Sequence, residues 1–208
     1  MIDENLLPHW KRLLLRKQRK QTNTDENVVF VGNGPSLKFR MMGETIDKFD
    51  VVCRFNMFNI KDYSKHTGTK TTHWFLNNLC RKDDNGLKEL IAYNNIKLIN
   101  KIFIKNFDRR NRGSFIRNMK CICTNIQEIG KKPQHQNLPK NKHPSFGLWG
   151  VFKFIELGYF PIYVIGFDLI DGKGGHYHDN KWNSSCHDIK SEELVWKELL
   201  DSGKVIRL

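Results

Sequence analysis

The stretch V-V-F-V-G-N-G-P-S, residues 28–36, is a short apolar run that breaks abruptly into small and turn-forming residues. The apolar run predicts a buried strand, and the residues after it predict a tight backbone turn. A strand that ends in this way can deliver a backbone loop to a phosphate-bearing ligand. Gly32-Asn33-Gly34 alone also fits an ordinary strand-to-helix turn, although Asn33 can donate and accept hydrogen bonds there. The motif departs from the dinucleotide fingerprint G-x-G-x-x-G, because Leu37 stands in place of the third glycine.

Strands and helices are predicted to alternate along the rest of the chain. Further strands are expected at residues 50–55, 72–76, 97–104, 120–124, 161–165 and 205–208, and helices at residues 86–93, 114–119, 145–158 and 188–200. Ser145 can cap the start of the third helix and Gly158 its end. Residues 131–143 and 168–186 are polar and predict loops, the first of them exposed. The alternation indicates an α/β domain with a mainly parallel central sheet flanked by helices.

The length and charge of the chain limit the number of domains and the kind of partner. Its 208 residues suffice for one well-buried domain, which we place at residues 28–208 after an N-terminal segment of residues 1–27. The formal net charge of +13 predicts an anionic partner: nucleic acid, an acidic membrane surface, or a negatively charged donor and acceptor. Residues 6–21 form a basic amphipathic pattern. As a helix, this pattern can lie on an anionic membrane, or pack on the domain or on a second subunit.

The cysteines and the hydropathy of the sequence indicate the cellular compartment in which the protein works. The five cysteines form no even framework and no C-x-x-C pair, which favours reduced thiols. No apolar stretch approaches membrane-spanning length, and the N-terminus lacks the apolar core of a signal peptide. We therefore expect a cytoplasmic protein, with residues 6–21 as the segment for peripheral contact with the inner face of a membrane.

Several polar and small residues directly follow predicted strands. They are Asn33 and Gly34 after the first strand, Asn56 after the second, and Gly166 after the strand at residues 161–165. Because ligands of parallel sheets bind at the carboxyl ends of strands, these residues should gather on one edge with the histidine-rich loop that follows Gly166.

The histidine-rich loop contains H-Y-H-D at residues 176–179 and H-D-I-K-S-E at residues 187–192. Histidine suits proton transfer near neutral pH, which favours an acid–base role for one or two of these side chains. His176, His178, Cys186 and His187 could instead be zinc ligands, but their spacing matches no common zinc site. No D-x-D pair is present to hold a metal on a nucleotide diphosphate, so no metal is expected.

Together these motifs resemble the sialyltransferase family, typified by the animal enzymes with their large, small, third and very-small sialylmotifs. Residues 28–73 follow the large motif nearly throughout, and residues 144–167, from P-S-F-G to I-Y-V-I-G-F, resemble the small motif. H-Y-H-D resembles the third motif, and His187 with Glu192 the very-small H-x4-E pattern. All four occur in the family's order, and the G-N-G-P-S loop is also similar to that of bacterial sialyltransferases.

The resemblance implies a Rossmann-like fold of a GT-A-like type and a metal-independent, inverting transfer of a sugar acid from a CMP-activated donor. It implies that His187 takes the proton from the acceptor hydroxyl and that His176 stabilises the departing phosphate. It also implies a set of nucleotide-binding residues: Asn33, Gly34 and Asn56 toward the phosphate and ribose, and Ser145, Gly147 and Gly166 around the cytidine. The implied partners are CMP-sialic acid and a glycan acceptor such as a capsule or lipooligosaccharide precursor, without nucleic acid and without a cofactor.

The chain also departs from the animal enzymes. Their large and small motifs are joined by a disulfide, whereas Phe30, Gly32 and Gly158 show no cysteine where that pair would sit. The membrane anchor of the animal enzymes is not expected here either. Both departures fit a cytoplasmic, bacterial-type enzyme.

Three alternatives stay open at this point. The donor can be CMP-Kdo, in a Kdo transferase of the same fold. A basic nucleic-acid-binding module would explain the charge but not the clustered motifs. A non-catalytic CMP binder would retain the binding motifs without the transfer reaction.

Overall fold

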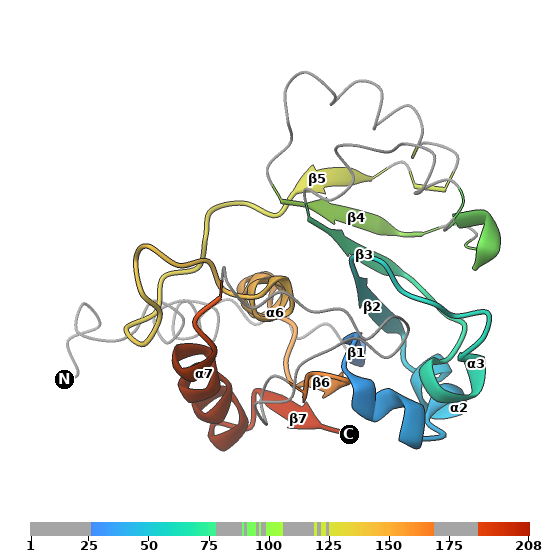
Figure 1. Ribbon diagram of the computed structural model, residues 1–208. Helices are drawn as coiled ribbons and strands as arrows, with labels where there is room; N and C mark the ends of the chain where they lie inside the picture. Colours follow the sequence, from blue (N-terminus) through green and yellow to red (C-terminus); the bar gives the residue numbers. More distant parts are fainter. Residues whose placement is uncertain are drawn as a thin grey trace.

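The computed structural model describes residues 26–77, 89, 91–94, 96, 99–105, 119, 122–123, 125–168 and 187–208. Within them the strands form one sheet in the order β5-β4-β3-β2-β1-β6-β7, and every neighbouring pair is parallel (Figure 1). The strands are β1 (Val28–Val31), β2 (Val51–Phe55), β3 (His73–Leu76), β4 (Lys101–Ile104), β5 (Ile126–Glu128), β6 (Ile162–Ile165) and β7 (Val205–Arg207). The predicted α/β class with a parallel sheet is confirmed.

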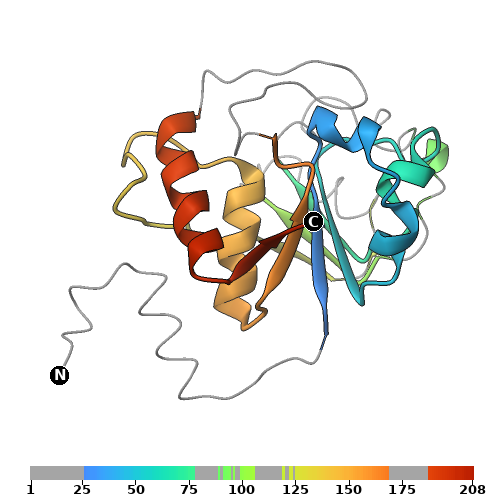
Figure 2. The ribbon, with the colours of Figure 1, turned by 90° about the horizontal axis from the view of Figure 1, so that it is seen from below.

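Helices cover both faces of the sheet. They are the 3-10 helix η2 (Pro35–Phe39) and the α-helices α2 (Gly43–Asp47), α3 (Ser64–Thr67), α6 (Phe146–Leu157) and α7 (Ile189–Asp201). Side chains of a strand alternate between the two faces, so Val28 and Phe30 share a core with α6 and α7, while Val29 and Val31 share one with η2 and α2. Figures 1 and 2 show α6 and α7 on one side of the sheet and α2 and α3 on the other. Burial on both faces explains why β1 is apolar at every position.

Most predicted elements are found close to their expected bounds. β1 spans the predicted residues, β2, β3, β6 and β7 differ from the prediction by one residue, and β4 starts later, at Lys101. The predicted caps of α6 are present, because Ser145 Oγ accepts a hydrogen bond from Leu148 N at 3.3 Å and Gly158 is left-handed with φ 96°. Residues 131–143 form the predicted loop, although His135 and Leu138 within it are buried.

The strand predicted at residues 120–124 is wrong. The backbone N–H groups of Ile122 and Cys123 both donate to Met119 O, at 3.0 and 2.9 Å, so the chain closes a turn there. The last strand of this side of the sheet is β5 instead, which pairs with β4 two residues further along the chain. Ile122 and Cys123 are apolar because they pack in a core beside β3 and β4, and that packing explains the strand-like pattern.

Several expectations fall wholly or partly outside the described residues. Of the helices predicted at 86–93 and 114–119, only residues 89, 91–93 and 119 are described, and each is helical. The basic segment at residues 6–21 and nearly all of the loop predicted at 168–186 lie outside. In the part of the chain that is described, no helix is long and apolar enough to cross a membrane.

The strand order places a topological switch beside β1. From β1 the chain adds β2 to β5 in succession on one side, and then returns to place β6 on the other side of β1. Ligands of open parallel sheets bind at such a point, outside the carboxyl ends of the strands. The loops after β1 and β6 therefore frame the expected binding site.

Candidate active site at the carboxyl edge of the sheet

The loops after β1 and β6 are joined backbone to backbone. Gly32 N donates to Ile165 O and Gly34 N donates to Gly166 O, both at 2.8 Å. A Cβ on Gly32 would lie 2.3 Å from Gly166 O, and one on Gly34 would lie 2.5 Å from Asp168 Cγ. Glycine is therefore required for this close approach, whether or not a ligand is bound. Gly166 itself turns with φ 71°, a conformation that favours glycine.

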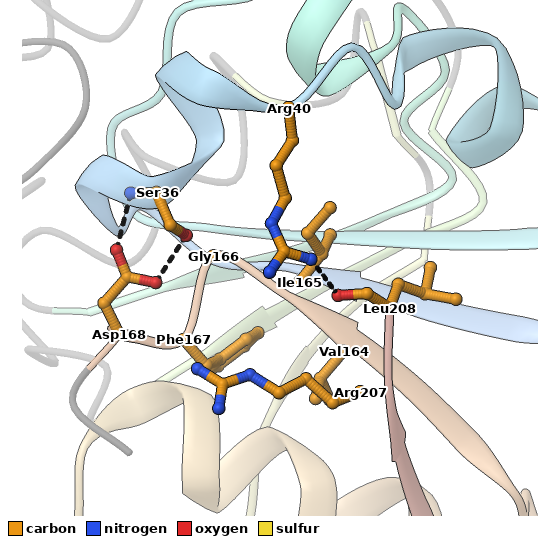
Figure 3. A pocket seen from close by; sticks show the side chains of 9 residues that line it. All are labelled: Ser36, Arg40, Val164, Ile165, Gly166, Phe167, Asp168, Arg207 and Leu208. Carbon is orange, nitrogen blue, oxygen red and sulfur yellow. Dashed lines mark hydrogen bonds between the residues drawn. The ribbon is translucent and has the colours of Figure 1, made fainter. Parts of the chain in front are cut away.

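Asp168 fastens the G-N-G-P-S loop to the end of β6. Its buried carboxylate accepts hydrogen bonds from Ser36 N at 2.6 Å and from Ser36 Oγ at 2.5 Å (Figure 3). The space among these residues, Arg40 and Arg207 is only about 10 Å³, which is room for about one water molecule. This pocket is too small for a nucleotide. Sequence reasoning missed Asp168, whose only signal was a carboxylate two residues after Gly166.

Asn33, after β1, contacts the residues on either side of Asn56, after β2, so these two predicted site residues lie close together. Asn33 Nδ2 donates to Phe55 O at 2.9 Å and to Met57 O at 3.0 Å, so it ties the first loop to the end of β2. Its Oδ1 is buried and accepts no hydrogen bond among the described residues. The acceptor oxygen, rather than the amide nitrogen, is what Asn33 can still offer to a ligand.

Asn56 is held in a left-handed conformation with φ 51°. Its N–H donates to Phe75 O at 2.7 Å, its carbonyl accepts from Trp74 Nε1 at 2.8 Å, and its Oδ1 accepts from Asn77 N at 3.0 Å. These contacts to β3 fix both the backbone and the orientation of the side-chain amide. Its Nδ2 makes no hydrogen bond within the described ranges and can donate to a bound anion.

Ser145 and Gly147 begin helix α6. A Cβ on Gly147 would lie 2.3 Å from Cε1 of Phe167, so this glycine lets the residue after Gly166 pack against the helix. Phe167 in turn contacts the rings of Phe55 and Trp196, with centroids 5.7 and 5.3 Å away. The start of α6 is therefore held directly against the ends of β2 and β6.

His187 precedes α7 and faces the residues before α6. Its Nδ1 lies 3.0 Å from His143 O, and because a carbonyl can only accept, Nδ1 must carry the hydrogen. In the neutral ring this leaves Nε2 with the lone pair, as a base requires. The Oε1 atom of Glu192 lies 3.8 Å from the same Nδ1 and also accepts from Ser145 N at 2.6 Å. The structure thus brings together His187 and Ser145, two predicted site residues.

Basic side chains surround this part of the edge. Partial burial, reinforced by the positive charges of Lys105, Lys132 and His187, lowers the pKa of His143. Lys105 follows β4, and its ammonium lies over the ring of Trp149 at 5.1 Å. A concentration of positive charge suits a ligand with phosphate and carboxylate groups.

Two predictions about the site are not addressed by this geometry. His176, together with His178 and Cys186, lies outside the described residues. Among those that are described, no group of three or more His, Cys, Asp or Glu residues could hold a metal ion.

Several known proteins are similar to this chain in sequence or in fold. Lactosylceramide alpha-2,3-sialyltransferase of Pan troglodytes is 38% identical over 52 residues, 25% of this chain and 14% of that protein. A crystal structure of a mammalian sialyltransferase in complex with Gal-beta-1-3GalNAc-ortho-nitrophenol has a TM-score of 0.61 at 17% identity, covering 100% of this chain and 86% of that one. CstII of Campylobacter jejuni in complex with cytidine-5'-monophosphate has a TM-score of 0.60 at 21% identity, covering 90% and 81%.

The two solved structures share the fold of this chain, and the resemblance drawn from the four motifs is confirmed. The local match to the curated relative covers a small fraction of that relative's length. The model of glycosyltransferase family 29 (sialyltransferase), by contrast, matches residues 4–204. The chain therefore belongs to glycosyltransferase family 29, the sialyltransferase family.

Proposed function

We propose that this protein is an inverting glycosyltransferase that moves sialic acid from CMP-sialic acid to a hydroxyl of a glycan. The observation that carries the proposal is the hydrogen bond from His187 Nδ1 to His143 O at the carboxyl edge of the sheet. It orients the imidazole and leaves Nε2 as the proton acceptor. Family membership supports the two substrates, as does the shared fold of a sialyltransferase bound to CMP and of one bound to a trisaccharide acceptor and CMP.

The donor would bind at the switch point beside β1. We assign its phosphate and ribose to the ends of β1 and β2, where Asn56 Nδ2 is a free donor and Asn33 Oδ1 a free acceptor within the described residues. The cytidine would lie along the start of α6, at Ser145 and Gly147, opposite Gly166. Gly34 would contribute by allowing the loops to approach, since its N–H is already used by Gly166 O.

The transfer needs a base on one side of the sugar and charge stabilisation on the other. Nε2 of His187 takes the proton of the acceptor hydroxyl, while the oxygen of that hydroxyl forms a bond to the anomeric carbon of sialic acid. The bond from that carbon to the CMP phosphate oxygen breaks, and its electron pair leaves with the phosphate, so the configuration inverts. His176 remains our proposal for stabilising the leaving phosphate. The basic side chains near His143 add favourable charge, and we propose that no metal is required.

The cellular setting is part of the proposal. A glycan destined for the cell surface, such as a capsule or lipooligosaccharide precursor, would be modified in the cytoplasm. Residues 6–21 would hold the enzyme at an anionic membrane. Binding to liposomes of phosphatidylglycerol by the full chain, compared with a chain lacking residues 1–25, tests this part separately.

Turnover of purified protein with CMP-sialic acid and, separately, with CMP-Kdo tests the proposed reaction. We expect CMP release and sugar transfer from CMP-sialic acid, and His187→Ala should lower kcat by roughly 10²–10⁴-fold, the usual contribution of a general base. CMP affinity should stay within about twofold, because the imidazole contacts the acceptor. His66→Ala on α3 is the matched control and should retain activity. Turnover of CMP-Kdo alone, or full activity of His187→Ala, would contradict the proposal.

A further inference from the structure

Glu192 connects two parts of the site that lie far apart in the sequence. It is 3% exposed, in the first turn of α7. Its Oε1 accepts from the backbone N–H of Ser145 at 2.6 Å and lies 3.8 Å from His187 Nδ1. Its Oε2 is also buried and has no hydrogen-bond partner among the described residues.

A purely structural role accounts poorly for a carboxylate here. Burial raises the pKa of Glu192, against the opposing effect of the hydrogen bonding to Ser145, so the charged form is unfavourable in isolation. Oε1 accepts a hydrogen bond from the neutral backbone N–H of Ser145, and a glutamine oxygen could accept it equally well. What glutamine could not supply is negative charge beside the imidazole.

The separation of 3.8 Å between Glu192 Oε1 and His187 Nδ1 determines how the carboxylate acts on the imidazole. It exceeds hydrogen-bond distance, and the Nδ1 hydrogen is already donated to His143 O at 3.0 Å. The carbonyl therefore orients the ring, while the carboxylate acts on it through charge alone. That effect grows when His187 takes up a proton, because only then do the two groups form an ion pair.

We propose that Glu192 is a positioning residue that stabilises protonated His187 during transfer and links this base to the nucleotide-binding start of α6 through Ser145 N. The inference rests on the proposed function, in which His187 is the base. One side chain thereby couples the donor-binding loop to the group that acts on the acceptor.

Other charged groups near Glu192 and His187 change the electrostatic environment of these two side chains. Asp188, the residue that caps the start of α7, adds negative charge and raises the pKa of Glu192 further. His143, in the loop before α6, and His187 oppose each other's positive charge, and Lys105 at the end of β4 and Lys132 in the loop after β5 add positive charge around His143. Glu192 is placed to offset that opposition, since its Oε1 lies 3.8 Å from Nδ1 of the imidazole.

The matched variants are Glu192→Gln and Glu193→Gln. Both remove one negative charge from neighbouring positions of α7, but the side chain of Glu193 makes no hydrogen bond or ion pair with the rest of the described chain. We expect Glu192→Gln to lower kcat at least about tenfold, within the roughly 10²–10⁴-fold contribution of a general base, with KM for CMP-sialic acid changed much less. Glu193→Gln should behave as the wild type.

The pH profile separates charge from structure. The carboxylate attracts the protonated imidazole and has no comparable effect on the neutral ring, and Glu192→Gln removes that attraction. The acid limb of kcat/KM should therefore shift to lower pH in Glu192→Gln. Glu192→Asp keeps the charge and should leave the limb near that of the wild type. If Glu192 had only a structural role, Glu192→Gln would lower the maximal kcat/KM or the melting temperature without shifting the acid limb of the pH profile.

Three outcomes are informative. A lower kcat with a shifted acid limb in a folded Glu192→Gln, and an unshifted limb in Glu192→Asp, supports the inference. An active wild type, an inactive His187→Ala and an unshifted Glu192→Gln would overturn the role of Glu192 alone. A wild type that binds CMP but transfers no sialic acid would instead overturn the proposed function, so the two failures are distinguishable.

Discussion

At the scale of single residues, Asn56 shows how the fold prepares a ligand contact. Asparagine tolerates the left-handed conformation that it adopts here, with φ 51°, better than most residues. Its backbone N–H, carbonyl and Oδ1 are all bonded to residues 74–77. Because these contacts are satisfied within the protein, the direction of Nδ2 is set before any ligand arrives.

Replacing Asn56 by aspartate tests this point. Asn56→Asp keeps an oxygen for Asn77 N but substitutes a second carboxylate oxygen for the donor Nδ2. A hydrogen bond to a charged group contributes about 1.5–3 kcal/mol, so CMP affinity should fall roughly 10- to 100-fold, measured by calorimetry. Asn56→Gly, which keeps the backbone conformation and adds no charge, should lose less. Equal CMP affinity in Asn56→Asp and the wild type would remove this side chain from the phosphate site.

At the scale of elements, β3 begins with a half-buried histidine that makes stability depend on pH. Burial, helped by the charge of Lys101, lowers the pKa of His73 from 6.5 to about 4. Its ring stacks on Phe103 of β4 with centroids 6.3 Å apart. In the unfolded chain His73 takes up a proton near pH 6.5, whereas in the folded protein it does so only near pH 4. Its contribution is therefore complete above pH 6.5 and is lost as the pH falls toward 4.

The change His73→Phe removes this titration and retains a ring against Phe103. A shift of this size corresponds to roughly 3 kcal/mol, so between pH 7.5 and pH 4 the wild type should lose about that much more unfolding free energy than the variant. Urea denaturation at several pH values measures the difference. Carboxylate titration affects both proteins and cancels in the comparison. Parallel stability curves for the two proteins would show that His73 is not the group responsible.

Elements with local signals were predictable, and those held by distant contacts were not. The apolar run of β1 and the caps of α6 at Ser145 and Gly158 depend on neighbouring residues, and both were predicted correctly. The 3-10 helix η2 was missed, because Ser36 at its start is held by Asp168, 132 residues away. The strand expected at residues 120–124 was misplaced, since packing beside β3 and β4 gives a turn the same apolar pattern as a strand.

The same distinction holds for the site. That Asn33, Asn56, Ser145 and Gly166 gather at one edge could be predicted, because strand ends of a parallel sheet meet there. The roles of the His143 carbonyl and of Asp168 could not, because backbone acceptors and long-range carboxylate contacts leave no pattern in the sequence. Glu192 was noticed as part of a motif, but its bond to Ser145 N emerges only from the folded chain.

At the scale of the whole molecule, the strand order assembles the site from segments that are far apart in the chain. The switch between β1 and β6 joins residues 32–34 to residues 165–168, and α6 and α7 bring Ser145, His143 and His187 to the same edge. The formal net charge of +13 favours an anionic ligand, and this edge combines free polar groups with close-packed glycines. The central claim is that these segments form one CMP-sugar site.

Titration of ¹⁵N-labelled protein with CMP, followed by amide chemical shifts, tests that claim most directly. The account predicts that Asn33, Asn56, Ser145 and Gly147 shift together with one dissociation constant, while amides at the amino ends of the strands, such as Val51 and Lys101, stay unchanged. The claim would be contradicted by saturable CMP binding whose shifts are confined to another surface, or by different dissociation constants for the β1–β2 loops and the start of α6.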